Sequence, residues 1–173
     1  MDHQPCLHLL CGKLASGKST LAREIAEREN AVLVSEDVWL AALCPGELCD
    51  FHDYLDRSLR FRGALEMHAE SILRTGASVV FDFAGNIPRE RAWAASVGTD
   101  AGAGCIVHHV VASDALCKRQ LRQRNEEQPA GSRVTTEAEF DAVTRYFVPP
   151  DPREDLEIRE HDAEARVREP EMP

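Results

Sequence analysis

The chain has 173 residues, of which 30 are acidic and 20 are lysine or arginine, so its formal net charge is −10. A chain of this length holds one full hydrophobic core and is too short for two ordinary domains. The negative charge disfavours nucleic acid as a partner, because proteins that bind polyanions usually present a basic face. A small or locally held substrate agrees better with this composition.

The cysteine spacing and the hydropathy pattern exclude two further classes of protein. The sequence has 6 cysteines but no CxxC pair, which favours reduced thiols over disulfides or a zinc site. No window approaches about 18 uncharged apolar residues, and no basic segment followed by a long apolar run opens the chain. We therefore expect a soluble, cytoplasmic protein without a membrane partner.

The most informative motif is GKLASGKST at residues 12–20, which fits the GxxxxGK[ST] phosphate-binding loop without a mismatch. The glycines let the backbone curl around an anion, and Lys18 adds positive charge where the β- and γ-phosphates of a nucleotide would lie. Ser19 is expected to hold Mg²⁺. The predicted nucleotide-binding residues of this loop are Gly12, Lys13, Leu14, Ala15, Ser16, Gly17, Lys18, Ser19 and Thr20. Lys18 is also expected to act in catalysis.

The sequence on either side of this loop predicts a strand before it and a helix after it. Cys6–Cys11 is a short apolar run of the buried-strand type. Leu21, Ile25 and Ala26 recur at helical spacing within residues 20–29. The N-terminus of this helix would add about half a positive charge to the phosphate site. A chance match in a surface loop is the alternative, and the two flanking elements argue against it.

A second apolar run, Ala31–Ser35, predicts a buried strand that ends directly before Glu36 and Asp37. Ligands of open α/β sheets collect at the carboxyl ends of the strands, so these carboxylates would share an edge with the phosphate loop. Asp37 is the candidate catalytic base, because a carboxylate there can accept a hydroxyl proton during phosphoryl transfer. Glu36 could serve Mg²⁺ through water. Alternatively, Asp37 or Ser35 only caps a helix over Val38–Leu43.

A third apolar run, Ala77–Phe83, carries Asp82 near its end. This arrangement is typical of a Walker B carboxylate, which would hold Mg²⁺ together with Ser19. Helices are expected over residues 56–74 and 89–96, before and after this strand. Residues between the second and third strands that could contact an acceptor are Trp39, Phe51, His52, Tyr54, Arg57 and Arg60.

The fourth strand is expected over Cys105–Ala112 and is followed by a helix that ends near Asn125 and carries the densest basic cluster of the chain. A basic run on a helix is usually a solvated face. The polar segment after it favours instead a lid over residues 118–136, whose arginines would offset the charge of a transferring phosphoryl group. Arg124 is the first candidate and is expected to act in catalysis. Arg122 and Arg133 are expected to bind the nucleotide.

The end of the chain is strongly acidic. A helix is predicted over Glu137–Phe147, and Leu156–Ile158 is a candidate edge strand. Residues 151–173 contain nine acids and four bases and contribute −5 of the net charge. We expect a single domain over residues 1–160 and a flexible acidic tail over residues 161–173.

The chain resembles the small P-loop kinases. The resemblance rests on four features in this order: the phosphate loop, the acid after the second strand, the Asp-ended third strand and the arginine-bearing lid. The nearest group contains chloramphenicol phosphotransferases, zeta toxins and the kinase domain of polynucleotide kinases. The resemblance covers about residues 7–146 and implies a three-layer αβα fold around a five-stranded parallel sheet in the order 2-3-1-4-5. It maps the catalytic aspartate of the family to Asp37 and its lid arginine to Arg124. A further family pattern after the third strand maps to Asp82, Asn86 and Arg91.

One departure from the family concerns the acceptor. Polynucleotide kinases have an arginine shortly after the aspartate of the second strand, where this chain has Trp39 and Leu40. The leading hypothesis is therefore an ATP-dependent kinase that uses Mg²⁺ and phosphorylates a hydroxyl of a small-molecule acceptor. The alternatives are a non-catalytic ATP-binding regulator and a nucleic-acid end kinase, whose binding would weaken steeply with salt.

Overall fold

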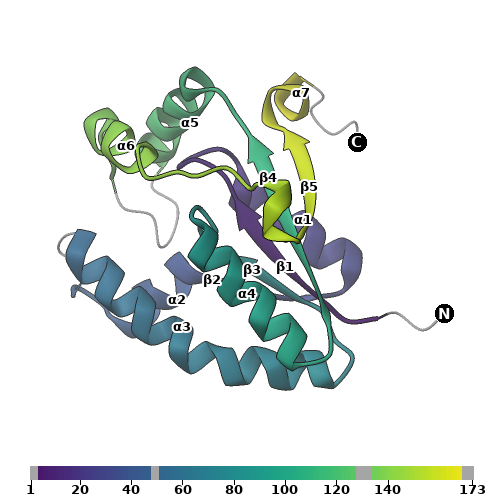
Figure 1. Ribbon diagram of the computed structural model, residues 1–173. Helices are drawn as coiled ribbons and strands as arrows, with labels where there is room; N and C mark the ends of the chain where they lie inside the picture. The colour runs from purple at the N-terminus through teal and green to yellow at the C-terminus, as the bar shows by residue number, and fades with distance from the viewer. Residues whose placement is uncertain (1–3, 48–50, 128–133, 169–173) are drawn as a thin grey trace.

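Strand β1 (Cys6–Cys11) lies at the centre of a five-stranded parallel sheet with the order β2-β3-β1-β4-β5. The other strands are β2 (Val32–Ser35), β3 (Val79–Asp82), β4 (Gly104–Val111) and β5 (Glu157–Asp162). The computed structural model describes residues 4–47, 51–127 and 134–168. Helices lie on both sides of the sheet, which confirms the expected αβα fold (Figure 1).

The helices divide into a group on each face of the sheet (Figure 1). One group consists of α2 (Glu36–Leu43), α3 (Phe51–Arg74) and α4 (Pro88–Asp100). The other consists of α1 (Lys18–Glu29), α5 (Asp114–Glu127), α6 (Glu137–Thr144) and α7 (Ala163–Arg168). A short 3-10 turn, η1 (Pro152–Glu154), precedes β5.

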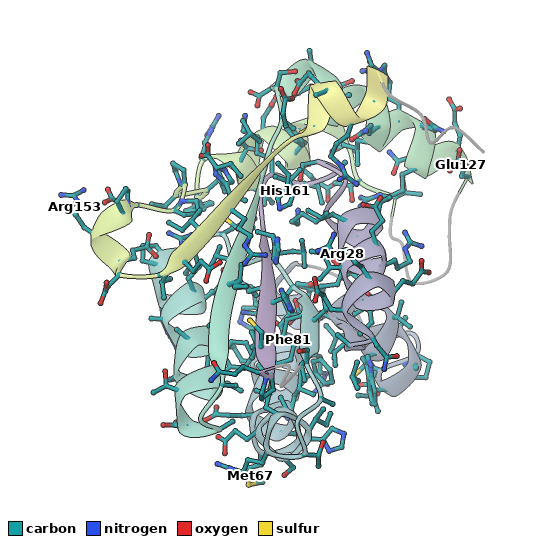
Figure 2. The ribbon with its side chains drawn as sticks, turned by 90° about the vertical axis from the view of Figure 1, so that its right-hand side faces the viewer. Arg28, Met67, Phe81, Glu127, Arg153 and His161 are labelled. Carbon is teal, nitrogen blue, oxygen red and sulfur yellow. The ribbon has the colours of Figure 1, made fainter. Side chains whose placement is uncertain are left out.

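Alternation along β1 explains why both faces of the sheet are apolar. Leu7 and Leu9 pack in the core beneath α3 and α4, whereas Leu10 packs in the core beneath α1 and α5. Successive side chains of a strand point to opposite faces, so a central strand in a three-layer fold must be apolar on both. Phe81, labelled in Figure 2, extends the first of these cores from β3. The five cysteines within the described residues are free thiols, as their spacing predicts.

The observed helix boundaries change the interpretation of two segments. Helix α1 begins at Lys18, so Lys18 and Ser19 belong to its first turn. Helix α2 begins at Glu36, which puts Glu36 and Asp37 inside the helix rather than before it. Ser35 is the N-cap residue but makes no capping hydrogen bond with its side chain. Ser35 thus takes the N-cap position that the alternative gave it, although its side chain does not cap, whereas Asp37 lies in the first turn of α2 and is not the cap.

The C-terminal segment is built differently from the prediction. Strand β5 pairs with β4 from Glu157 to Asp162, so the expected boundary after residue 160 falls inside a strand. Helix α7 follows directly, and its first residue, Ala163, is buried against the core beneath α1 and α5. Pairing and apolar burial thus order residues 161–168, and residues 169–173 of the predicted tail lie outside the described range.

A row of three histidines crosses the sheet on the α1 side. His8 Nδ1 lies 3.0 Å from His108 Nε2, and His108 Nδ1 lies 3.0 Å from His161 Nε2. His161, labelled in Figure 2, comes from β5 at the edge of the sheet. Burial lowers the pKa of His108 to about 3, and the pKa of His161 is lowered for the same reason. A neutral imidazole has one N–H and one lone pair, so His108 donates to one neighbour and accepts from the other.

A buried arginine ties the C-terminal segment to the loop after β3. Arg91 on α4 has no exposed surface, and its guanidinium donates to Glu154 at 2.6 and 2.8 Å. The same guanidinium donates to the carbonyl oxygens of Gly85 at 2.9 Å and Val148 at 3.0 Å. Because its donors are taken up by these groups, the role of Arg91 is structural, although the family pattern grouped it with Asp82.

Candidate functional site

The phosphate loop joins β1 to α1, and its two glycines are required by its backbone. Gly12 has φ +150°, and a Cβ atom there would lie 2.8 Å from the carbonyl oxygen of Val110. Gly17 has φ +95° and is the N-cap residue of α1. Left-handed φ values are costly for residues with a Cβ atom, so this sequence folds locally into a loop that opens onto a helix N-terminus.

The lysine of the motif closes over the loop. Lys18 Nζ donates to the carbonyl oxygens of Gly12 at 2.9 Å and Lys13 at 2.7 Å. Burial lowers the pKa of Lys18, and the negative charge of Asp82 opposes this shift. The side chain of Lys13 points elsewhere, to Asp114 Oδ1 at 2.5 Å, so Lys13 can serve the site only through its backbone.

Two hydroxyls hold the carboxylate at the end of β3. Ser19 Oγ donates to Asp82 Oδ1 at 3.1 Å, and Ser35 Oγ donates to Asp82 Oδ2 at 3.1 Å. Mg²⁺ is usually bound by one or two carboxylates, substrate phosphates and water rather than by a cage of protein side chains. These oxygens fit that preference, and within the described residues no group of three or more His, Cys, Asp and Glu residues could hold a metal. The sequence named Ser35 only as a possible helix cap and not as a partner of Asp82.

The two consecutive acids at the start of α2 have separate surroundings. Glu36 is 2% exposed and accepts from Arg62 Nε at 2.7 Å and from Ser58 Oγ at 2.6 Å. A second bond runs from Arg62 Nη2 to the other oxygen of Glu36 at 3.1 Å. Glu36 therefore anchors α2 to α3, and its oxygens are occupied by protein donors rather than available as a base or a magnesium ligand.

Asp37 is exposed, and its negative charge acts on Lys18 of the phosphate loop. Tyr54 Oη lies 3.1 Å from its Oδ1. Desolvation is the main cause that raises the pKa of Asp37, and the negative charges of Glu36 and Asp82 raise it further. The Tyr54 hydroxyl and the positive charge of Arg124 act in the opposite direction. Asp37 is thus a carboxylate whose environment favours proton uptake.

The predicted lid arginines separate in space. Arg124 is half-buried on α5, and its charge lies close enough to Asp37 to lower the pKa of that carboxyl. Arg122 is exposed and forms an ion pair with Glu137 on α6, so its side chain is directed at α6. Arg133 lies outside the described residues. Of the two described arginines, the structure brings Arg124 to the site and not Arg122.

Asparagines support both the phosphate loop and the segment predicted as a lid. Asn86 Oδ1 accepts from the backbone N–H of Gly12 at 3.0 Å, which fixes the first residue of the phosphate loop. Asn125 Nδ2 donates to the Thr135 carbonyl oxygen at 2.7 Å, and the Thr135 N–H donates back to Asn125 Oδ1 at 3.1 Å. Only the family pattern hinted at Asn86. The pairing of Asn125 with Thr135 has no local sequence signal.

Of the other residues expected near an acceptor, three have protein partners. Arg57 pairs with Glu47 at 2.8 Å, and Arg60 pairs with Asp56 at 3.2 Å. Trp39 is 45% exposed and stacks on Phe61 with a centroid distance of 5.7 Å. These contacts neutralise both arginines. The side chain of Phe51 lies outside the described part of the structure.

A family model matches most of the sequence. Residues 7–150 match the model of AAA_33, which is described as an AAA domain. The chain belongs to the AAA_33 family. No curated protein matches this AAA_33 chain.

Solved structures share the fold of this AAA_33 protein at low sequence identity. A protein from Chloroflexus aurantiacus, provisionally assigned as a kinase, is 21% identical with a TM-score of 0.71, over 96% of this chain and 93% of that one. Kti12 from Chaetomium thermophilum, solved with ADP-AlF3, is 18% identical with a TM-score of 0.69, over 94% of each chain. A sugar kinase from Janibacter sp. is 13% identical with a TM-score of 0.67, over 92% of this chain and 86% of that chain.

These similarities confirm that the AAA_33 chain has the P-loop kinase-like fold and support a nucleotide-binding role. At such identities the solved structures establish the fold alone. Among the helices of the described residues, none combines the length and the apolar character needed to span a bilayer.

Proposed function

We propose that this AAA_33 protein is a kinase that transfers the γ-phosphoryl group of ATP to a hydroxyl of a small-molecule acceptor. The observation that carries the proposal is Asp37, a carboxylate of raised pKa that shares one site with Lys18, Asp82 and Arg124. A site that only held a nucleotide would need the loop and the lysine but not a carboxylate prepared for proton uptake.

The donor half of the reaction would use the phosphate loop. Its backbone N–H groups and Lys18 would bind the β- and γ-phosphates, and the N-terminus of α1 would favour their negative charge. Ser19 and Asp82 would hold Mg²⁺, which supplies neutralisation of the phosphate charge when it is bound. Ser35 would keep the Asp82 carboxylate oriented through its hydroxyl.

The acceptor half would use Asp37. The carboxylate of Asp37 would take the proton of the acceptor hydroxyl while the hydroxyl oxygen forms a bond to the γ-phosphorus and the bond to the β,γ-bridging oxygen breaks. Arg124 would offset the negative charge that spreads over the phosphoryl oxygens in the transition state. The products are ADP and the phosphorylated acceptor, and Asp37 then releases its proton to water.

A small acceptor is favoured over a nucleic acid end. The net charge of −10 opposes a polyanion, and Arg57 and Arg60 on α3 are neutralised by neighbouring acids. The fold shared with a sugar kinase supports a small acceptor by analogy.

A screen with γ-labelled ATP against a metabolite extract tests this proposal, with the labelled product identified by mass. The matched variants are Asp37→Asn, which removes the proposed base, and Asp100→Asn, which changes an exposed aspartate at the end of α4. We expect Asp100→Asn to behave as wild type and Asp37→Asn to lose at least about a hundredfold in transfer rate.

Two results would contradict the proposal. ATP binding without any acceptor-dependent turnover would indicate a non-catalytic regulator. Transfer to the 5′-hydroxyl of an oligonucleotide, with binding that weakens steeply as salt rises, would instead indicate a nucleic-acid end kinase.

A further inference from the structure

A continuous chain of polar contacts connects the phosphate loop to the helical layer that carries the proposed base. The Gly12 N–H donates to Asn86 Oδ1 at 3.0 Å, and the Asn86 N–H donates to Glu90 Oε2 at 2.9 Å. Arg62 Nη1 then donates to Glu90 Oε1 at 3.2 Å. The other nitrogens of Arg62 reach Glu36 at 2.7 and 3.1 Å. The donor loop and the start of α2 are therefore held by one network.

Tyr54 on α3 is the last member of this network. Its Oη lies 3.0 Å from Glu36 Oε2 and 3.1 Å from Asp37 Oδ1. The phenol has a single proton, so it can donate to one of these carboxylates at a time. Burial and the two nearby acids raise the pKa of Tyr54 well above its ordinary value, and the phenol stays protonated.

The position of that proton depends on the charge of Asp37. When Asp37 is ionised, the Tyr54 O–H can donate to it, because Glu36 still accepts from Arg62 and Ser58. When Asp37 is protonated, its own O–H can donate to Tyr54 Oη, which leaves the phenolic proton for Glu36. Asp37 thereby keeps a hydrogen bond to Tyr54 in both of its protonation states, and no heavy atom has to move.

We propose that Tyr54 is a positioning residue whose hydroxyl turns from Asp37 to Glu36 when Asp37 gains a proton from the acceptor. This proposal rests on the proposed kinase function and deepens it. The proton that leaves the acceptor bonds to an oxygen of Asp37, while Tyr54 keeps its own proton and only changes the direction of its O–H bond. Glu36 keeps its hydrogen bonds from Arg62 and Ser58 throughout.

The groups that act on Asp37 lie on several elements and set the expected direction of change, and Lys18 on α1 is one of them. Glu36 on α2 and Asp82 on β3 raise its pKa, whereas Tyr54 on α3 and Arg124 on α5 lower it. Loss of the Tyr54 hydroxyl should therefore raise the pKa of Asp37 further. A tyrosine that only filled space would not move this value, because phenylalanine has nearly the same shape.

The test uses Tyr54→Phe with Tyr146→Phe as the matched control, since Tyr146 is 75% exposed. Carbon-13 NMR of the aspartate carboxyls follows the titration of Asp37 in each protein. We expect a rise of about one pKa unit in Tyr54→Phe and no change in Tyr146→Phe. Once the acceptor is known, the acid limb of the pH–rate profile should move to higher pH by the same amount. An unchanged Asp37 pKa in folded Tyr54→Phe overturns the role assigned to Tyr54.

A second measurement on the wild-type protein needs no variant. The ring Cζ resonance of Tyr54 should titrate with the same midpoint as the carboxyl of Asp37, while the Cζ resonance of Tyr146 does not follow it. A Tyr54 resonance that stays flat through the Asp37 titration overturns the proposal even if Tyr54→Phe does not fold.

Both readouts are independent of the acceptor, so they separate the two proposals. If the Tyr54 and Asp37 signals titrate together but no acceptor is ever phosphorylated, the coupling stands and the kinase function fails. If phosphoryl transfer depends on Asp37 but the pKa of Asp37 does not change in Tyr54→Phe, the kinase function stands and the coupling fails.

Discussion

The histidine row across the sheet predicts that acid destabilises this fold well above the pH at which carboxylates titrate. In the folded protein, burial and the neighbouring rings of His8 and His161 lower the pKa of His108 to about 3. In the unfolded chain the same side chain has its ordinary pKa of about 6.5. Below that pH the unfolded chain binds a proton that the folded protein does not, so the free energy of unfolding falls as the pH falls.

The size of this effect follows from the difference between the two pKa values. At pH 5 the pKa of His108 in the unfolded chain lies about 1.5 units above the pH, and each unit corresponds to about 1.4 kcal/mol. His108 alone should therefore lower the free energy of unfolding by about 2 kcal/mol between pH 7 and pH 5. The loss should continue to grow until the pH approaches about 3, where the folded protein also binds the proton.

Urea unfolding at pH 7 and pH 5 measures this difference in wild type, His108→Gln and His68→Gln. His68 is exposed on α3 and serves as the control. Each protein is compared with itself at the two pH values, so a change in its overall stability cancels. Between pH 7 and pH 5, the free energy of unfolding of wild type and of His68→Gln should fall by about 2 kcal/mol more than that of His108→Gln. Equal losses in all three proteins would refute the neutral, head-to-tail row.

Three further predictions concern the site and its support. Lys18→Ala should weaken ATP binding at least about tenfold in calorimetry, because it removes a charged donor to the phosphates; unchanged affinity would contradict its role. Arg124→Ala should slow transfer at least about a hundredfold and raise the pKa of Asp37, whereas Arg122→Ala, whose side chain pairs with Glu137, should stay near wild type in a labelled-ATP assay. Glu154→Gln should lower the free energy of unfolding in urea by about 3 kcal/mol, because it leaves the guanidinium of Arg91 buried without its counter-charge; a loss below about 1 kcal/mol would contradict the structural importance of this pair.

The features that the sequence predicts well are those encoded in short, continuous segments. The phosphate loop is recognisable because a backbone that binds phosphate needs glycine at fixed positions, as Gly12 and Gly17 show by their φ values. Asp82 is recognisable because an apolar strand of a parallel sheet leads a terminal acid to the ligand-binding edge. The order of the five strands follows from the family resemblance rather than from any local pattern, and the structure confirms it.

The features that the sequence does not reveal are contacts between distant segments. Glu36 and Asp37 look equivalent as neighbours in the chain, and only the position of Arg62, 26 residues later, makes Glu36 a buried anchor. The histidine row joins residues 100 positions apart, and Asn86 reaches Gly12 across 74. No periodicity or spacing rule marks such partners, because the folded packing brings them together from distant parts of the chain.

The hydrogen bonds of Arg91 have a consequence for the order in which the protein folds during synthesis. Residues 12–20 are synthesised before Asn86, which supports that loop from a segment whose neighbour Gly85 is bonded to Arg91. The counter-charge of Arg91 is Glu154, 63 residues further along the chain. A nascent chain would therefore hold an incompletely supported phosphate loop until residue 154 has been made. Nucleotide binding should accordingly reach its full strength only after residue 154 has been made and has paired with Arg91.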